Sequence, residues 1–217
     1  MFNLRRFIVF NRLWIAILLI ALGFYLGFQV TWWLGWLPVF IAIIMVVAHF
    51  LVGPVTLMQR YIESGDVEGA KVLLDKVKYP NLLYKPVRSM YYSLKSNFST
   101  MNEDWDSAEA ELRKGLESGG TDKDYQGTAM FQLGSICYRK GDMKEAYEHL
   151  RKAIQIGLPD ADTSATAYLY LTSICLQRRN YKGGKFYFAK AKAAKPKNKD
   201  IVEQIEEMKK TISRIPG

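Results

Sequence analysis

The sequence contains few of the residue types from which metal and nucleophilic sites are built. Its 217 residues include two cysteines and two histidines. These four residues are not clustered along the chain, so no zinc site is predicted. Gly183-Gly184 falls within a predicted helix and does not form a phosphate-binding loop, and Asp160 and Asp162 lack the remaining ligands of a calcium loop. We therefore expect a protein that is not an enzyme and that has no catalytic residue, metal or cofactor.

Charge is missing from a long stretch near the N-terminus, because residues 13–59 contain no Lys, Arg, Asp or Glu. One membrane-spanning helix needs about 20 apolar residues, so the stretch has room for two. We predict spans over 13–30 and 37–59, joined by a tryptophan-rich turn at 31–36. A buried soluble hairpin is disfavoured by the unbroken apolarity, and a cleaved signal peptide by the lack of a small-residue cleavage site.

The charges that flank this stretch predict its orientation. Arg5, Arg6 and Arg12 precede the first span, Arg60 follows the second, and the turn carries no charge. The positive-inside rule then places both termini and everything after the spans in the cytoplasm. We expect a multi-pass protein of the cytoplasmic (inner) membrane.

The remainder of the chain repeats with a period of 38 residues. A polar pair marks each unit and is followed at fixed distances by a small residue and then a large apolar one. A fixed period of this length is typical of stacked helical hairpins, each of which cannot bury its apolar face alone. The four pairs are Gly65-Asp66, Glu103-Asp104, Gly141-Asp142 and Arg179-Asn180. Cys137 and Cys175 are also one period apart, which predicts that they are packing residues.

The third and fourth units resemble the tetratricopeptide repeat, a helix-turn-helix with small residues where its two helices touch. The matching residues are Leu133-Gly134, Ala146, Leu150, Ala153 and Pro159 in the third unit and Leu171, Gly184, Phe188, Ala191 and Pro196 in the fourth. In the second unit Lys95 and Ser96 replace Leu133-Gly134, so its first helix matches least. The first unit takes its leading helix from 52–63, which continues the second span as one rod.

The expected fold is all-α and has three parts. Residues 1–60 form a transmembrane helical hairpin, 61–198 an α-solenoid of tetratricopeptide-like hairpins, and 199–217 a C-terminal capping helix. The resemblance implies a groove lined by first-helix residues, in which a peptide of a protein partner lies. The matching positions are Ser93, Asn97, Phe131, Ser135, Tyr138, Arg139, Leu169, Ser173 and Gln177.

Other features have both a structural and a functional interpretation. Gly23 and Gly27 form a small-xxx-small pair that packs either on the chain's own second span or on another membrane subunit. His49, the one ionisable residue inside the spans, is interpreted as a neutral structural residue, and His149 as a surface residue. A basic face is a solvated surface, a contact for anionic lipid, or a contact for an acidic protein segment or nucleic acid, and of these nucleic acid is disfavoured. Its members are Arg178, Arg179, Lys182, Lys185, Lys190 and Lys192.

These features together predict a membrane-anchored scaffold that recruits, assembles or stabilises a membrane complex by binding protein partners in the cytoplasm. One alternative is an accessory subunit whose main contacts are made by the transmembrane helices. The other is an electrostatic adaptor that contacts anionic lipid or RNA through the basic face.

Overall fold

The computed structural model describes residues 11–29, 32–52, 58, 61, 64–119 and 122–214. Throughout these residues the regular elements are helices, which confirms the predicted all-α class. The chain divides into two compact units, residues 1–91 and 92–217, and each is described by itself.

The first unit contains two long apolar helices followed by shorter elements. They are α2 (Arg12–Gln29), α3 (Trp32–Val52), α5 (Val67–Asp75), the 3-10 helix η1 (Pro80–Leu82) and the beginning of α6 (Lys85–Met101). The second unit contains the rest of α6 and six further helices. These are α7 (Trp105–Glu117), α8 (Lys123–Lys140), α9 (Met143–Ile156), α10 (Ala161–Gln177), α11 (Tyr181–Ala193) and α12 (Lys199–Ser213).

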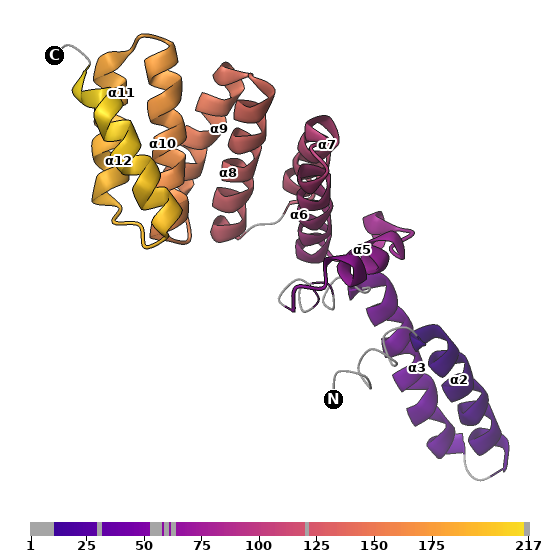
Figure 1. Cartoon of the computed structure of the whole chain (residues 1–217). Coiled ribbons are helices and arrows are strands. Elements are labelled where there is room, and N and C mark those ends of the chain that lie inside the picture. The colour runs from indigo at the N-terminus through magenta and orange to yellow at the C-terminus, as the bar shows by residue number, and fades with distance from the viewer. Residues whose placement is uncertain are drawn as a thin grey trace. The chain divides into compact units, whose positions relative to one another are not determined.

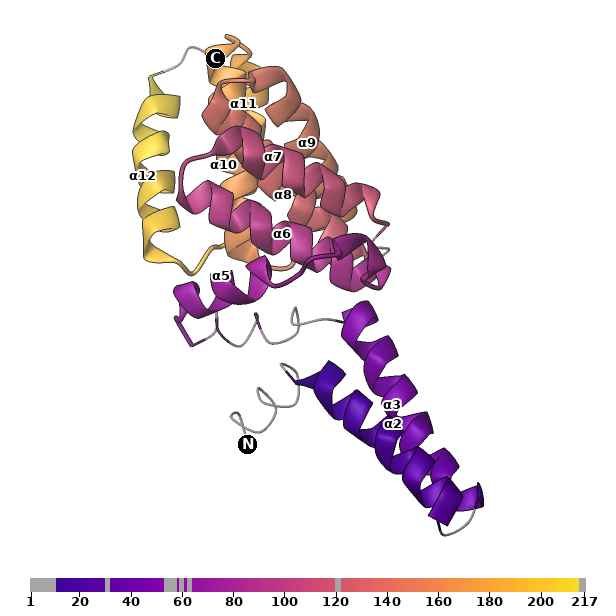
Figure 2. The ribbon, with the colours of Figure 1, turned by 90° about the vertical axis from the view of Figure 1, so that its right-hand side faces the viewer.

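The helices α2 and α3 pack along one another as a hairpin (Figures 1 and 2). At its open end the Arg12 Nη1 donates a hydrogen bond of 3.2 Å to the backbone oxygen of Ala48. By length and composition α2 is long and apolar enough to cross a membrane, whereas the apolar part of α3, Gly35–His49, is shorter than such a helix. The turn predicted at 31–36 is wrong because α3 already begins at Trp32, which lets Gly35 pack against α2.

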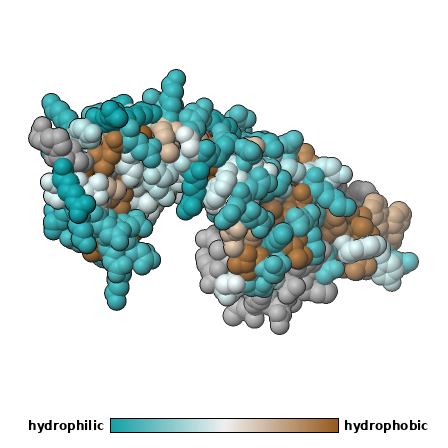
Figure 3. Space-filling model, turned by 45° about the horizontal axis from the view of Figure 1, so that its top comes forward, coloured by the Kyte–Doolittle hydropathy of each residue, from teal (hydrophilic) through white to brown (hydrophobic). Residues whose placement is uncertain are grey.

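Large apolar side chains cover the outside of this hairpin. Only Ala16 and Gly23 of α2 are buried, while Trp14 is 70% exposed and Phe28 87%. Hydrophobic colour accordingly gathers on this part of the molecular surface, and hydrophilic colour covers much of the later helices (Figure 3). Apolar surface of this extent requires a covering environment.

The rod predicted over 52–63 lies mostly outside the described residues. Within it, Met58 and Tyr61 are helical and buried. The backbone nitrogen of Asp66 donates to the Tyr61 oxygen at 2.8 Å, which closes the turn that leads into α5.

The structure confirms a turn at each of the four predicted positions. Gly65, Glu103, Gly141 and Arg179 all have positive φ angles, of 77°, 59°, 85° and 56°. The next residue in each case is an N-cap whose side chain accepts a hydrogen bond from the backbone nitrogen three residues later. A left-handed residue followed by a cap ends one helix and starts the next within two residues.

The packing positions of the register are buried in the same order. Ala70, Ala108 and Ala146 are each 0% exposed, and Gly184 is buried in the fourth unit. The large residues four positions later are buried as well: Leu74, Leu112, Leu150 and Phe188. Val77 differs from prediction because α5 ends at Asp75, so Val77 is only half-buried beyond the helix.

A second series with the same period marks the start of the first helices. The N-caps Asp122, Asp160 and Asn198 precede α8, α10 and α12. The last helix therefore begins where the first helix of a further unit would begin. Its Ile205 packs on Leu169, Phe188 and Ala191, so α12 covers the end of the α10–α11 hairpin.

The helix for which the sequence pattern was weakest, α6, forms with polar packing. Ser96 is 1% exposed and donates a hydrogen bond of 2.7 Å to the backbone oxygen of Ala108. Lys95 pairs with Glu111 at 2.9 Å. A buried, hydrogen-bonded serine thus occupies the position that Gly134 fills in the next hairpin, and a partly exposed, ion-paired lysine the position of Leu133.

Replacing Arg179 with glycine should stabilise the protein by about 0.5–1 kcal/mol, because glycine adopts the left-handed conformation without a Cβ clash. The reciprocal Gly141→Arg change should cost about 1 kcal/mol. Thermal unfolding followed by circular dichroism in detergent measures both. Ala189→Gly, in the exposed middle of α11, is the matched control and should lower Tm. A lower Tm for Arg179→Gly would contradict the assignment of the turn.

Candidate functional site

A cleft lies between the first helices α6 and α8 of two consecutive hairpins. Its volume is about 120 Å³. Four of the nine predicted groove residues line it, namely Asn97, Phe131, Ser135 and Arg139. They come together because positions three or four residues apart share one side of a helix.

Two amides and one cation supply the exposed polar groups of the cleft. Gln132 Nε2 donates to Asn97 Oδ1 at 3.3 Å, which connects the two walls. The Arg139 guanidinium lies 5.3 Å from the centre of the Trp105 ring, and the cation–π contact holds it at one end of the cleft. The hydroxyls are already used, since Ser135 donates to the Phe131 backbone oxygen and Thr100 to that of Ser96.

The other predicted groove residues lie elsewhere. Tyr138 packs against Tyr170 with ring centres 4.8 Å apart and the rings tilted, and Ser93 Oγ lies 3.1 Å from the Tyr125 hydroxyl. Leu169 is 5% exposed, so its prediction as a groove residue is wrong. Helix α12 covers it, because Leu169 lies in one apolar cluster with Ile205 of that helix. Ser173 is half-buried and Gln177 is exposed, and neither lines the cleft.

Four further residues, none of them predicted from the sequence, also line the cleft: Ser96, Thr100, Gln132 and Ile136. Each is adjacent to a predicted position or three to four residues from one. The helical period therefore indicated that these residues share a side of the helix with the predicted ones. They were missed because only the positions implied by the repeat family were selected.

The structure brings together Cys137, Glu145 and His149, whose ligand atoms all lie within 4.8 Å of one another. The expectation that histidine and cysteine are not clustered is thus wrong in three dimensions. The surface position expected for His149 is wrong too, because its side chain is only 12% exposed. The cause is the hairpin, which places α9 against α8, while Arg113 of α7 pairs with Glu145 beside His149.

This cluster does not suit a metal ion. Arg113 Nη2 already lies 2.5 Å from Glu145 Oε2, and its charge disfavours a cation there. Burial, followed by the charges of Glu109 and Glu145, raises the pKa of the Cys137 thiol to about 11. Burial and then Arg113 lower the pKa of His149, whose Nδ1 is buried without a hydrogen-bond partner. Metal-binding histidines normally donate from this second nitrogen.

An ion-pair network around Arg113 instead connects three helices. Arg113 bridges Glu109 of α7 and Glu145 of α9, while Lys140 of α8 pairs with Asp106 at 2.6 Å and Glu109 at 2.7 Å. Burial would raise the pKa of Glu109, but hydrogen bonds from Lys140 and Arg113 outweigh it and lower that pKa. The cluster therefore serves packing between consecutive hairpins.

The predicted basic face divides into structural and exposed members. Arg178 donates to the Met143 backbone oxygen at 2.7 Å and lies 5.2 Å from the Tyr147 ring centre, so it joins α10 to α9. Arg179 provides the left-handed turn. Lys182, Lys190 and Lys192 are exposed along α11, while Lys185 is half-buried.

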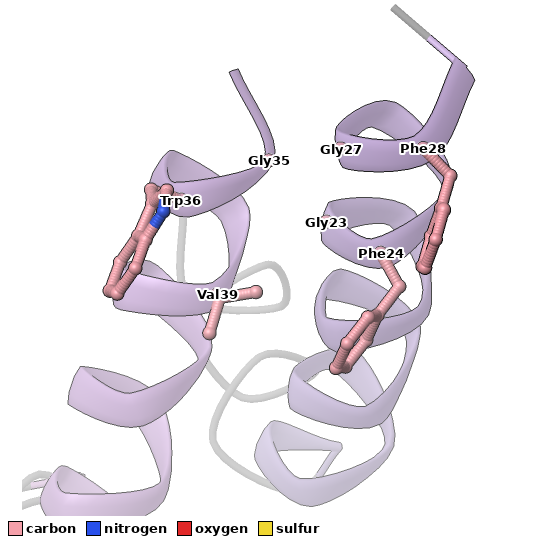
Figure 4. A pocket seen from close by; sticks show the side chains of 7 residues that line it. All are labelled: Gly23, Phe24, Gly27, Phe28, Gly35, Trp36 and Val39. Atoms are coloured by element: carbon pink, nitrogen blue, oxygen red, sulfur yellow. The ribbon is translucent and has the colours of Figure 1, made fainter. Parts of the chain in front are cut away.

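The Gly23 and Gly27 pair lies against Gly35 of the same chain (Figure 4). A Cβ on Gly23 would meet the Gly35 oxygen at 2.8 Å, whereas one on Gly27 would find its nearest neighbour at 3.9 Å. Next to this contact, Phe24, Phe28 and Trp36 help to line a hollow of about 290 Å³. The close approach of the two helices therefore depends on Gly23 and Gly35.

No model of a known protein family matches the chain, and no curated protein is significantly similar to it. The resemblance to the tetratricopeptide repeat therefore stays a prediction.

Replacing Gly23 with alanine should loosen the α2–α3 hairpin, because the added methyl meets a backbone oxygen that cannot move away. We expect a cost of about 1–3 kcal/mol. Gly27→Ala is the matched control and should change stability by less than about 0.5 kcal/mol. Thermal unfolding in detergent, followed by tryptophan fluorescence, measures both. Equal effects of the two substitutions would contradict this packing.

The Cys137 thiol should be nearly unreactive in the folded protein. A pKa of about 11 in place of 9.0 lowers the thiolate fraction at pH 8 about 100-fold, and the thiolate is the nucleophile. Iodoacetamide labelling at pH 8, read by mass spectrometry of the Cys137 peptide, should be at least that much slower than in urea. Similar rates in folded and unfolded protein would refute the assignment.

Proposed function

We propose that the protein is a membrane-anchored scaffold of the tetratricopeptide type that binds a peptide segment of a protein partner and thereby assembles or stabilises a membrane complex. The α2–α3 hairpin is the proposed anchor, both helices span the membrane, and the helices from α5 onward form an α-solenoid in the cytoplasm. The role is binding, without catalysis.

The apolar hairpin supports the anchoring. Its outward side chains are large and exposed, and the spans predicted at 13–30 and 37–59 contain no charged residue. Only a bilayer or another apolar partner removes such a surface from water at low cost. The basic residues flanking the spans favour the cytoplasmic orientation of both termini.

The two series of turns and caps support the repeat architecture. Left-handed residues and N-caps recur every 38 positions, and the same packing positions are buried in successive hairpins. Contacts of α7 with α8, of α9 with α10 and of α10 with α12 connect each hairpin to the next helix. Stacked hairpins with this pattern are typical of helical solenoids.

The observation that carries the binding function is the cleft between α6 and α8. It has an apolar floor that includes Phe131 and Ile136, and an edge formed by the amides of Asn97 and Gln132. Amides at this spacing suit the backbone of an extended peptide, which offers both donors and acceptors. Arg139 at the end of the cleft favours a ligand with an acidic side chain there.

The accessory-subunit alternative has less support. Gly23 packs closely against Gly35 and Val39 of the same chain, so part of the small-residue face is already occupied. The remaining feature in its favour is the hollow lined by Phe24, Phe28 and Trp36, which an apolar side chain of another subunit fits.

Photo-crosslinking in native membranes tests the cleft. A photoreactive residue in place of Asn97 or Gln132 should give adducts with a defined partner at least about tenfold more often than one in place of Glu148, an exposed residue of α9. Arg139→Glu should reduce the adducts by about tenfold or more, because it places a negative charge where an acidic ligand binds.

The same experiment separates the alternatives. Adducts that form from Phe28 or Trp36 but not from Asn97 or Gln132 would favour the accessory-subunit function. Equal yields from Asn97 and Glu148 would contradict a binding cleft.

A further inference from the structure

The outward side of α11 carries a narrow ridge formed by Lys182, Phe186 and Lys190, which we call the α11 ridge. These residues are four positions apart, so they lie along one side of the helix. All three are exposed, and Phe186 is 57% exposed although it is a large aromatic residue. The Lys190 Nζ lies 5.8 Å from the Phe186 ring centre. The other side of α11 is used for packing, through Gly184, Phe188 and Ala191.

The repeat itself supplies an internal comparison for this ridge. The second helix of every earlier hairpin exposes three residues at the same positions of the register, and each of those sets contains an acidic residue. They are Glu68 and Val72 on α5 with its C-cap Lys76, Asp106-Ala110-Lys114 on α7 and Lys144-Glu148-Lys152 on α9. Among these helices only α11 has lysines on both sides of an aromatic residue and no acidic residue at these three positions.

The charge around the α11 ridge has one sign along the chain. Residues 178–199 contain nine basic residues and no acidic one. The ion pairs formed between described residues involve neither Lys182 nor Lys190. Two unneutralised cations therefore stand beside an exposed apolar ring.

We propose that the α11 ridge docks on the surface of an anionic lipid bilayer, with Phe186 entering the interfacial layer and Lys182 and Lys190 contacting lipid phosphates. Lysines close to an anionic leaflet are attracted to it, and an aromatic ring is favoured at headgroup depth. The inference rests on the membrane anchoring proposed above, which tethers the chain to a bilayer.

The shape of the ridge favours a bilayer over RNA or a peptide. Neither the cleft nor the hollow described above includes a residue of α11. Single-stranded nucleic acid is bound by several aromatic platforms along a basic groove, whereas this ridge offers one ring. A lipid surface needs only a protruding apolar side chain with cations at its sides.

Lysine footprinting of the full-length chain in vesicles tests the proposal. The protein is reconstituted into phosphatidylcholine vesicles with and without phosphatidylglycerol, and brief acetylation of each lysine is read by mass spectrometry. In the anionic vesicles Lys182 and Lys190 should react at least about fivefold more slowly, the factor that one lysine near such a surface contributes. Lys144 and Lys152, at the same register positions on α9, are internal controls and should not change.

Salt and substitution give matched checks. About 0.5 M salt should restore the reactivity, because it screens the attraction. Phe186→Glu, which recreates the lysine-glutamate-lysine pattern of α9, should abolish the protection, whereas Glu148→Ala should leave it unchanged. Circular dichroism should show unaltered helix content in both variants, since both positions are exposed.

Several outcomes would overturn the proposal. These are equal protection in neutral and anionic vesicles, protection by inorganic phosphate alone, or protection by single-stranded RNA without anionic lipid. Failure of the anchor is seen separately, as release of the whole chain from vesicles at alkaline pH. If the chain stays in the vesicles while Lys182 and Lys190 remain fully reactive, the ridge proposal fails and the anchor stands.

Discussion

The turn between the two helices of each hairpin is the constraint on which the packing of the second unit depends. One residue in the left-handed region ends a helix, and an Asp or Asn directly after it caps the next. Since the chain reverses within two residues, the two helices of a hairpin start at fixed positions relative to the turn. They therefore touch at the same register position in each unit. A small residue then has to stand where they touch, as Ala108 and Ala146 do. Glu103 and Arg179 adopt the left-handed conformation although they are not glycine, which is unfavourable for a residue with a Cβ. The turn therefore forms at these register positions even where the residue itself disfavours it.

The contacts between hairpins vary far more than the turns within them. Around Arg113 and Lys140 the joining groups are carboxylates and cations. One period later the guanidinium groups of Arg151 and Arg178 lie 5.7 and 5.2 Å from the ring centre of Tyr147. The cleft at Asn97 lies at such a contact between hairpins, and the residues of the exposed α11 ridge also differ from those at the same register positions of earlier hairpins. Positions that differ between otherwise equivalent units are therefore the ones on which both the proposed cleft and the proposed lipid contact depend.

Most of the fold could be predicted from the sequence, while the candidate site could be predicted only in part. The turns, the caps and the buried small residues followed from a local rule that repeats, and the structure has them at the expected numbers. The start of α3 at Trp32 was missed because tryptophans near a membrane suggested an interfacial turn, whereas contact between Gly35 and Gly23 keeps the segment helical. His149 was misplaced because its neighbours Arg113 and Cys137 come from other helices.

By itself the sequence determined what depends on near neighbours: the helical class, the 38-residue register, the capping groups and the charge-free stretch at 13–59. Only the tertiary structure decided which helical faces meet. It covered Leu169 with α12, placed Asn97 beside Gln132, and set Gly23 against Gly35. The physical reason is range. Turn and cap energies act over a few residues along the chain, but burial depends on which distant segment removes a surface from water.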